Sequence, residues 1–170
     1  MIIYLASDHA GLELKDKVKF FLKKLAYQIE DCGAFEFNKD DDYPDFVAKA
    51  AEKVSKDPEN SMGIIFGGSG QAEMMVANKF KNVRCALFYA TAAPVKAVDI
   101  TGRKSSDPYE MIRLVREHNN ANMLSLAARL LTDGEAQTAV EMFLTTVFPK
   151  DERHLRRIDK IKEIENKNYV

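Results

Sequence analysis

The stretch Gly63-Ile64-Ile65-Phe66-Gly67-Gly68-Ser69-Gly70-Gln71-Ala72-Glu73 decides the fold class of this chain. Its apolar start predicts a buried strand, its glycines predict a tight turn, and the residues after Glu73 continue as a helix. Such a turn directs several backbone N–H groups at one point, where the helix dipole adds positive charge. An anion or a developing oxyanion is the expected occupant, with the Glu73 carboxylate within reach. A turn without a ligand, in which Glu73 only complements the dipole, explains these residues equally well.

Strands and helices alternate on both sides of this stretch. Short apolar runs predict further strands at residues 2–6, 27–30, 84–88 and 122–126. Between them, apolar residues at helical spacing predict helices, of which two begin at capping boxes, Asp107 with Glu110 and Thr132 with Glu135. The alternation predicts an α/β fold, a Rossmann-like three-layer α/β/α domain with a five-stranded parallel sheet and a C-terminal helical arm.

The composition is that of a single globular domain with no nucleic-acid or membrane partner. The 170 residues are 46% hydrophobic and 30% charged, and a net charge of -1 gives no basic field for nucleic acid. The apolar runs are too short to span a membrane, and the N-terminus lacks the features of a signal peptide. Neither the two cysteines nor the three histidines have metal-ligand spacing, so we expect a reduced, cytoplasmic protein without a metal site.

Ligands of parallel α/β sheets bind beyond the carboxyl ends of the strands. We therefore expect Asp8 and His9, residues 67–73, the residues from Tyr89 onward, and Arg129 to lie close together. The acidic stretch 39–42 is predicted to be a solvated loop. Three common sites are excluded, because a dinucleotide GxGxxG after the first strand, a P-loop Gly-Lys-Ser/Thr and a GxSxG nucleophile elbow do not occur.

Several segments resemble, in order and over nearly the whole chain, the type B ribose-5-phosphate isomerase family, which also contains the galactose-6-phosphate isomerase subunits. The matching segments are Ser7-Asp8-His9-Ala10-Gly11, Asp42-Tyr43-Pro44, Gly68-Ser69-Gly70, Ala77-Asn78-Lys79, Arg116-Glu117-His118-Asn119-Asn120-Ala121-Asn122, Ala128-Arg129 and Arg153-His154-Leu155-Arg156-Arg157.

The resemblance implies a cofactor-independent aldose–ketose isomerase that moves a proton between C1 and C2 of a sugar phosphate through an enediolate. Ribose 5-phosphate and ribulose 5-phosphate are the expected substrates. The alternatives are another sugar phosphate of four to six carbons, or a non-catalytic sugar-phosphate-binding subunit. In many members the base is a cysteine at the position of Gly67, whereas one branch uses a glutamate that matches Glu73.

The resemblance also implies roles for the other site residues. Asp8 matches the acid that handles the sugar hydroxyls, and His118 matches the ring-opening histidine. Read alone, Asp8 is typical of a helix cap and His118 of a surface histidine. The expected catalytic residues are Asp8, Ser69, Glu73 and His118. The expected substrate-binding residues around the oxyanion and the sugar are Tyr43, Gly68, Gly70, Gln71, Ala72 and Asn119.

A basic cluster on the last predicted helix is the expected phosphate site. Arg153, His154 and Arg157 are spaced so that their side chains can converge on a phosphate, although such a run read alone is more often a solvated helix face. The resemblance adds Arg129 and His9. It also implies that the arm, residues 151–170, packs on a partner subunit and reaches its site, while residues 1–150 form the isomerase domain. A homodimer with shared active sites is therefore expected, with a tetramer as the alternative.

Two features depart from the family pattern. Ala72 replaces a glycine that is usual in the loop. About eighteen residues, roughly 89–106, are extra between the fourth strand and the helix that leads to His118, at a place where insertions commonly alter specificity. This insertion is predicted to act as a lid, a specificity element or an oligomer contact.

Overall fold

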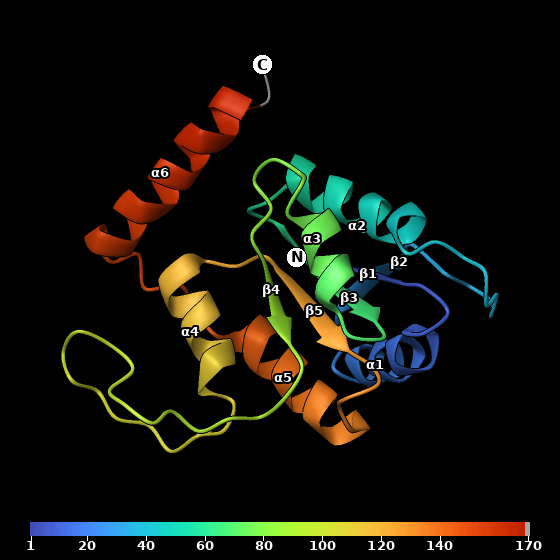
Figure 1. The fold of residues 1–170 in the computed structure, drawn as a ribbon, viewed down its shortest axis with the longest axis horizontal. Coiled ribbons are helices and arrows are strands. Elements are labelled where there is room, and N and C mark those ends of the chain that lie inside the picture. Colours follow the sequence, from blue (N-terminus) through green and yellow to red (C-terminus); the bar gives the residue numbers. More distant parts are fainter. Residues whose placement is uncertain (169–170) are drawn as a thin grey trace.

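A computed structural model describes residues 1–168 of the chain. Its centre is a sheet of five parallel strands in the order β2-β1-β3-β5-β4 (Figure 1). The strands are β1 (Ile2–Ser7), β2 (Gln28–Asp31), β3 (Ser61–Gly67), β4 (Cys85–Phe88) and β5 (Met123–Ala127). The predicted Rossmann-like fold is confirmed, and the strand ends differ from the expected ones by only one or two residues.

Helices cover both faces of the sheet and form two separate cores. The helices are α1 (Leu12–Lys24), α2 (Pro44–Lys56), α3 (Gln71–Ala77), α4 (Glu110–Asn119), α5 (Asp133–Thr145) and α6 (Glu152–Asn168). One core joins α1, α4 and α5 to the sheet, and the other joins α2 and α3 to its opposite face. Fully buried side chains such as Leu124 and Val47 each stabilise these layers by about 1.5–3 kcal/mol.

The two predicted capping boxes have different outcomes. At α5, the Thr132 hydroxyl accepts from the Glu135 backbone N–H and the Glu135 carboxylate accepts from the Thr132 N–H, as predicted. At α4 the prediction is wrong. Asp107 accepts from the Tyr109 N–H, and the buried Glu110 carboxylate pairs with Arg113 instead of reaching back. A nearby guanidinium thus replaces the backbone N–H as the partner of Glu110.

The topology places two chain segments next to each other at the carboxyl edge of the sheet. The chain leaves β1 toward β2 and later returns to β3 on the other side of β1, which creates a switch point between β1 and β3. Asp8 and His9 follow β1, and the glycine turn at residues 68–70 follows β3. At Gly11 a Cβ would lie 2.5 Å from the Phe66 carbonyl carbon, so the start of α1 approaches β3 closely.

The arm and the insertion lie on the β4 side of the molecule. Helix α6 lies beyond α4, apart from the helices that cover the sheet (Figure 1). It buries Ile158 but exposes Leu155, Ile161 and Ile164. Between Phe88 and Glu110 the chain forms no helix or strand, and it returns along α4, where Arg103 pairs with Glu117 at 2.7 Å. Within residues 1–168 no helix is both long and apolar enough to cross a membrane.

Candidate active site

Asp8 forms the turn that follows β1. Its buried carboxylate accepts hydrogen bonds from the backbone N–H groups of Ala10 and Gly11, at 3.0 and 3.1 Å. Helix α1 begins only at Leu12, so Asp8 caps the turn before the helix and not the helix itself. One carboxylate oxygen is held by these bonds, while the other stays available to a ligand.

Glu73 lies in the first turn of α3, and its side chain is folded back over Gly67. The residue is only 4% exposed. A Cβ built on Gly67 would lie 2.0 Å from both Cδ and Oε1 of Glu73. The carboxylate therefore occupies the space that any side chain at position 67 would fill.

The environment of Glu73 favours its protonated form. Burial raises the pKa of the Glu73 carboxyl, and the negative charge of Asp8 raises it further, whereas the backbone N–H of Glu73 itself acts in the opposite direction. A carboxylate with a raised pKa is a stronger base than an exposed one. Asp8 and Glu73, which follow β1 and β3, are thus close enough for their charges to interact.

The glycine turn between β3 and α3 is held in place from β5. Gly70 has a left-handed backbone, φ 70°, and its carbonyl accepts from the Ser125 hydroxyl at 2.6 Å. The first backbone N–H groups of a helix have no intrahelical partner, so those of α3 can turn to a ligand. Ser69 is exposed, and its hydroxyl accepts weakly from the Gln71 N–H at 3.4 Å.

Arg129 lies beside the glycine turn that follows β3. Its backbone N–H donates to the Gly68 carbonyl at 3.1 Å, and its guanidinium Cζ would lie 3.2 Å from a Cβ at Gly68. Glycine at position 68 therefore leaves room for the guanidinium over the turn. Tyr43 immediately precedes α2 and is half-buried, two residues after Asp41.

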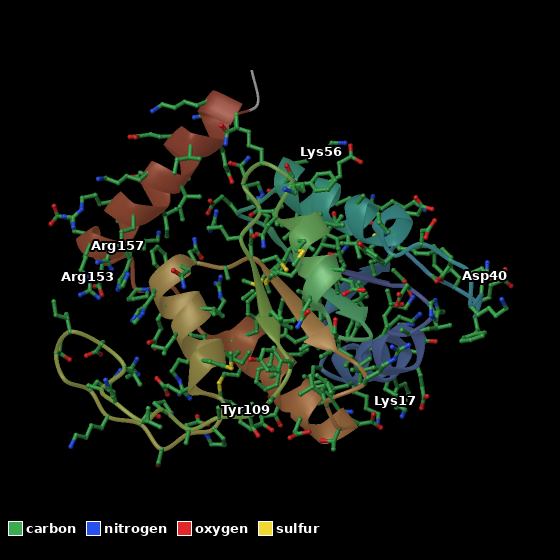
Figure 2. The ribbon with its side chains drawn as sticks, in the orientation of Figure 1. Lys17, Asp40, Lys56, Tyr109, Arg153 and Arg157 are labelled. Carbon is green, nitrogen blue, oxygen red and sulfur yellow. The ribbon has the colours of Figure 1, made fainter. Side chains whose placement is uncertain are left out.

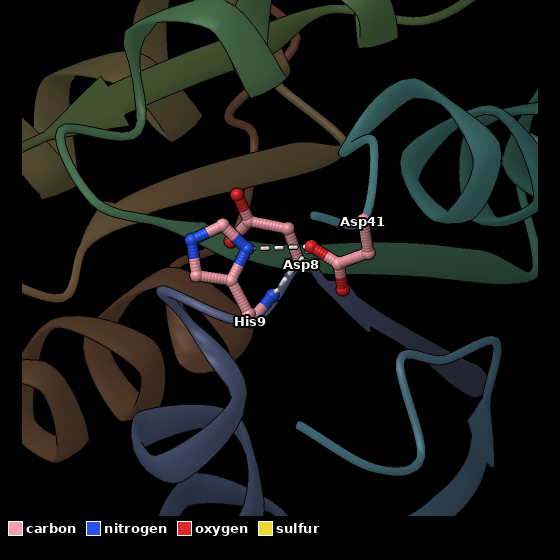
Figure 3. Close-up of side chains that lie close together, drawn as sticks. All are labelled: Asp8, His9 and Asp41. Carbon is pink, nitrogen blue, oxygen red and sulfur yellow. Dashed lines mark hydrogen bonds and ion pairs between the residues drawn. The ribbon is translucent and has the colours of Figure 1, made fainter. Parts of the chain in front are cut away.

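The acidic loop 39–42 is not uniformly solvated, and for Asp41 that prediction is wrong. The Asp41 side chain is 7% exposed, whereas that of Asp40 is 74% exposed. Oδ1 of Asp41 lies 2.6 Å from the His9 ring Nδ1 and also accepts from the His9 backbone N–H at 3.2 Å (Figure 3). The sequence does not distinguish Asp41 from the aspartates on either side, because only the conformation of the folded loop turns its side chain inward.

Asp8, His9 and Asp41 also have the donor types of a cation site. Their ligand atoms lie within 4.8 Å of one another. His9 Nδ1 and Asp41 Oδ1 already bond to each other directly, which commits two of these atoms. That the protein needs no metal stays a prediction.

A second group of predicted site residues surrounds a hollow of about 710 Å³ between α4, α6 and the insertion. The rings of His118 and His154 stack there with centroids 4.4 Å apart. Burial lowers the pKa of His154, and the positive charges of His118 and Arg153 lower it further. Arg153 and Arg157 extend from the start of α6 (Figure 2).

The two groups lie at opposite ends of the sheet. Arg84, which directly precedes β4, donates from Nε to the carbonyls of Asn119 and Asn120, both at 3.0 Å. His118 and Asn119 are thus at the amino end of β4, while Glu73 is at the carboxyl end of β3, and all strands are parallel. Sequence reasoning did not anticipate that one chain separates its expected catalytic residues by the length of the sheet.

The family follows from comparison with known proteins. A family model described as Ribose/Galactose Isomerase matches residues 3–161. The chain belongs to this family. Ribose-5-phosphate isomerase B of Mycolicibacterium paratuberculosis is 41% identical over 165 residues, which cover 97% of this chain and 92% of the relative. The enzyme of the same name from Mycobacterium tuberculosis is 39% identical over 165 residues, covering 97% and 90%.

Solved structures of the ribose/galactose isomerase family share the fold. Ribose-5-phosphate isomerase B of Mycoplasma genitalium with bound ribulose-5-phosphate superposes with a TM-score of 0.84 at 37% identity, covering 97% of this chain and 96% of that one. The Clostridium thermocellum enzyme gives 0.82 at 34% identity and covers 99% of each chain. The resemblance inferred from sequence is confirmed, and as a family member the chain is an aldose–ketose isomerase.

Proposed function

We propose that the protein interconverts ribose 5-phosphate and ribulose 5-phosphate through an enediolate, with Glu73 as the base. The observation that carries the proposal is the position of the Glu73 carboxylate, buried over the side-chain-free Gly67 at the carboxyl edge of the sheet. The curated relatives named above are ribose-5-phosphate isomerases, and a structural neighbour holds ribulose-5-phosphate.

The reaction needs one proton to move between two carbons and another between two oxygens. Glu73 takes the proton from C2 of the open-chain aldose and returns it to C1, so the base is regenerated. Between these steps negative charge develops on the oxygen of C1. The backbone N–H groups of Ala72 and Gln71 stabilise it, and Gln71 gives up its weak bond to the Ser69 hydroxyl to do so. Asp8 has one carboxylate oxygen held by the backbone, and with the other it carries the second proton from the hydroxyl of C2 to the oxygen of C1.

Neither cysteine is suited to be the base. Cys32 and Cys85 are both buried and unpaired. Burial raises the pKa of Cys32 to about 11, and burial also raises the pKa of Cys85. A buried thiol with a raised pKa is a poor source of the thiolate nucleophile or base. The carboxylate of Glu73 therefore supplies the basic group that the vacant cysteine position at Gly67 does not.

A homodimer would complete the active site. In one chain, His118, Arg153 and Arg157 are too far from Glu73 to contact the same sugar phosphate. A second copy can place its His118, Arg153 and Arg157 beside Glu73 of the first copy, and twofold symmetry then builds two such sites. The exposed apolar residues of α6 support an interface at the arm, because isolated monomers rarely expose such a row. Arg153 and Arg157 then bind the phosphate through their guanidinium groups.

A different sugar phosphate is the second candidate substrate, and the insertion favours it. Asp99, Thr101 and Arg103 line the same hollow as His118 and Arg153. Arg103 is fixed there by ion pairs with Glu117 at 2.7 Å and with Asp99 at 3.1 Å. A rigid wall beside the sugar-binding residues is suited to select chain length without altering the chemistry.

Isomerase assays with pentose, tetrose and hexose phosphates test both the reaction and the substrate. We expect ribose 5-phosphate to be the preferred sugar, and Glu73→Gln to lower turnover by at least about a hundredfold, the scale of general-base loss. Glu141→Gln, on the exposed side of α5, is the matched control and should keep native turnover. A native protein that bound sugar phosphates without converting any of them would be a binding subunit and not an enzyme.

A further inference from the structure

Asp41 holds His9 by both its backbone and its ring. The carboxylate Oδ1 accepts from the His9 backbone N–H at 3.2 Å and lies 2.6 Å from ring Nδ1. A single oxygen that bonds both groups restricts both side-chain torsions of the histidine. The two residues come from the segments that follow the adjacent strands β1 and β2, so the bond also joins two parts of the site edge.

The Asp41 bond determines which ring nitrogen is free. A carboxylate accepts hydrogen bonds and does not donate them, so Nδ1 of His9 carries the proton of this bond. Nε2 is then the ring atom left for a ligand, and it points away from Asp41 (Figure 3). The imidazole is 25% exposed, which leaves that edge accessible while Asp41 is covered.

The loop that carries Asp41 also contacts the His9 ring through Phe37. Phe37 contacts the His9 ring edge-on, with centroids 5.9 Å apart and planes at 83°. The loop that carries Phe37 and Asp41 is attached to the end of β1, because the Ser7 N–H donates to the Gly33 carbonyl and the Ala34 N–H donates to the Ser7 carbonyl, both at 2.7 Å. His9 thus lies between this anchored loop and the Asp8 carboxylate.

Burial of the Asp41 carboxylate costs folding free energy, which is not expected of a residue whose role is only structural. Oδ2 is buried and has no hydrogen-bond partner within the part of the chain that the structure describes. An unpartnered buried carboxylate oxygen destabilises the fold, and a neutral side chain of similar size would avoid this cost. Its presence here is better explained by the two bonds that Oδ1 makes to His9 than by a gain in stability.

We propose that Asp41 is a positioning residue for substrate binding, which acts through His9. It holds the imidazole so that Nε2 accepts a hydrogen bond from a hydroxyl of the bound sugar phosphate beside Asp8 and Glu73. This proposal rests on the proposed isomerase function. Asp41 does not touch the substrate itself, and its contribution is to fix the tautomer and orientation of the ring in advance.

Nitrogen-15 NMR of the full-length chain tests the positioning directly. The chain has only three histidines, so the His9 ring signals can be assigned by comparison with His9→Ala. We expect the native His9 ring to be a single Nδ1–H species and Asp41→Ala to give a mixture of tautomers. The exposed neighbour supplies the control, Asp40→Ala, which should leave the ring signals unchanged. Unchanged His9 signals in Asp41→Ala would overturn the proposal, whether or not the protein is active.

A double-mutant cycle with ribose 5-phosphate tests the link to binding. Asp41→Ala should raise KM by about tenfold to a hundredfold, by analogy with the loss seen when the hydrogen-bond partner of a metal-binding histidine is removed. The double variant with His9→Ala should be no worse than His9→Ala alone, because both changes remove one function. Additive losses in the cycle would show that Asp41 acts only on the fold and would refute the proposal. Failure of the native chain to convert any sugar phosphate would instead refute the proposed function and would leave the NMR result to decide the role of Asp41.

Discussion

Adding a single methyl group at Gly67 should disable the proposed base without removing it. In Gly67→Ala the new Cβ would lie 2.0 Å from Cδ of Glu73, whereas ordinary contact begins at 3.4 Å. The carboxylate must therefore move by about 1.4 Å, the difference between these two distances. The clash involves only the end of a flexible side chain, so the backbone of β3 and α3 can keep its conformation.

A displacement of this size should lower the catalytic rate strongly but change the stability of the fold little. Misplacement of a reacting group by about 1 Å can cost roughly a hundredfold in rate, so we expect kcat of Gly67→Ala to fall by about that factor. KM should change little, because Arg153 and Arg157, the residues proposed to bind the phosphate, are not touched. The displaced carboxylate also leaves its buried position, so its pKa falls and the acid limb of the kcat profile moves to lower pH.

The assay is steady-state isomerisation of ribose 5-phosphate across pH, together with thermal unfolding. The matched control is Gly134→Ala, because a Cβ there meets no atom within 4 Å and Glu73 is untouched. It should keep native kcat. If Gly67→Ala kept native kcat and the native pH profile while Gly134→Ala did the same, the position of Glu73 over Gly67 would be irrelevant to catalysis.

Three further predictions concern Glu73, the dimer and the phosphate. Because the pKa of Glu73 is raised in the folded state, ionisation of this carboxyl lowers the stability of the fold as pH rises through that pKa. Glu73→Gln should therefore have a higher melting temperature than the native protein near about pH 8 and the same melting temperature near about pH 4. Identical melting temperatures of the two proteins at both pH values would contradict the burial argument. When the Glu73→Gln and His118→Ala variants are mixed, dissociated and reassociated, about a quarter of native activity should return. Half of the random dimers contain one chain of each variant, and each such dimer has one intact site out of two. If no activity returned, Glu73 and His118 would have to act in the site of a single chain. Arg157→Ala should raise KM by about tenfold or more with kcat nearly unchanged, and an unchanged KM would remove Arg157 from the phosphate site.

Much of the fold was predictable because it depends on local patterns. The alternation of apolar runs and helical spacing around Gly67 to Glu73 required only strand periodicity and turn residues, and the sheet has the expected five parallel strands. The α4 capping box was not predictable in the same way. Glu110 lies where a capping box needs it, but Arg113 one turn later offers a charged partner that the pattern does not weigh.

The site was predictable residue by residue but not as an arrangement. Asp8 and Glu73 follow adjacent strands, so topology alone brings them together. His118 comes at the end of a helix that runs back to the amino edge of the sheet, and sequence spacing does not reveal that this takes it away from Glu73. Asp41 was missed because its neighbours Asp40 and Asp42 have the same side chain and only the fold of the loop turns one of them inward.

The measurement that tests the central claim most directly is exchange of substrate hydrogen with solvent deuterium. A base that carries a proton from C2 to C1 through an enediolate lets that proton exchange, so the native protein in D₂O should place deuterium at C1 of ribulose 5-phosphate and at C2 of recovered ribose 5-phosphate. Glu73→Gln should abolish this exchange with ribose 5-phosphate still bound. Conversion without any deuterium uptake, or native exchange in Glu73→Gln, would contradict the account.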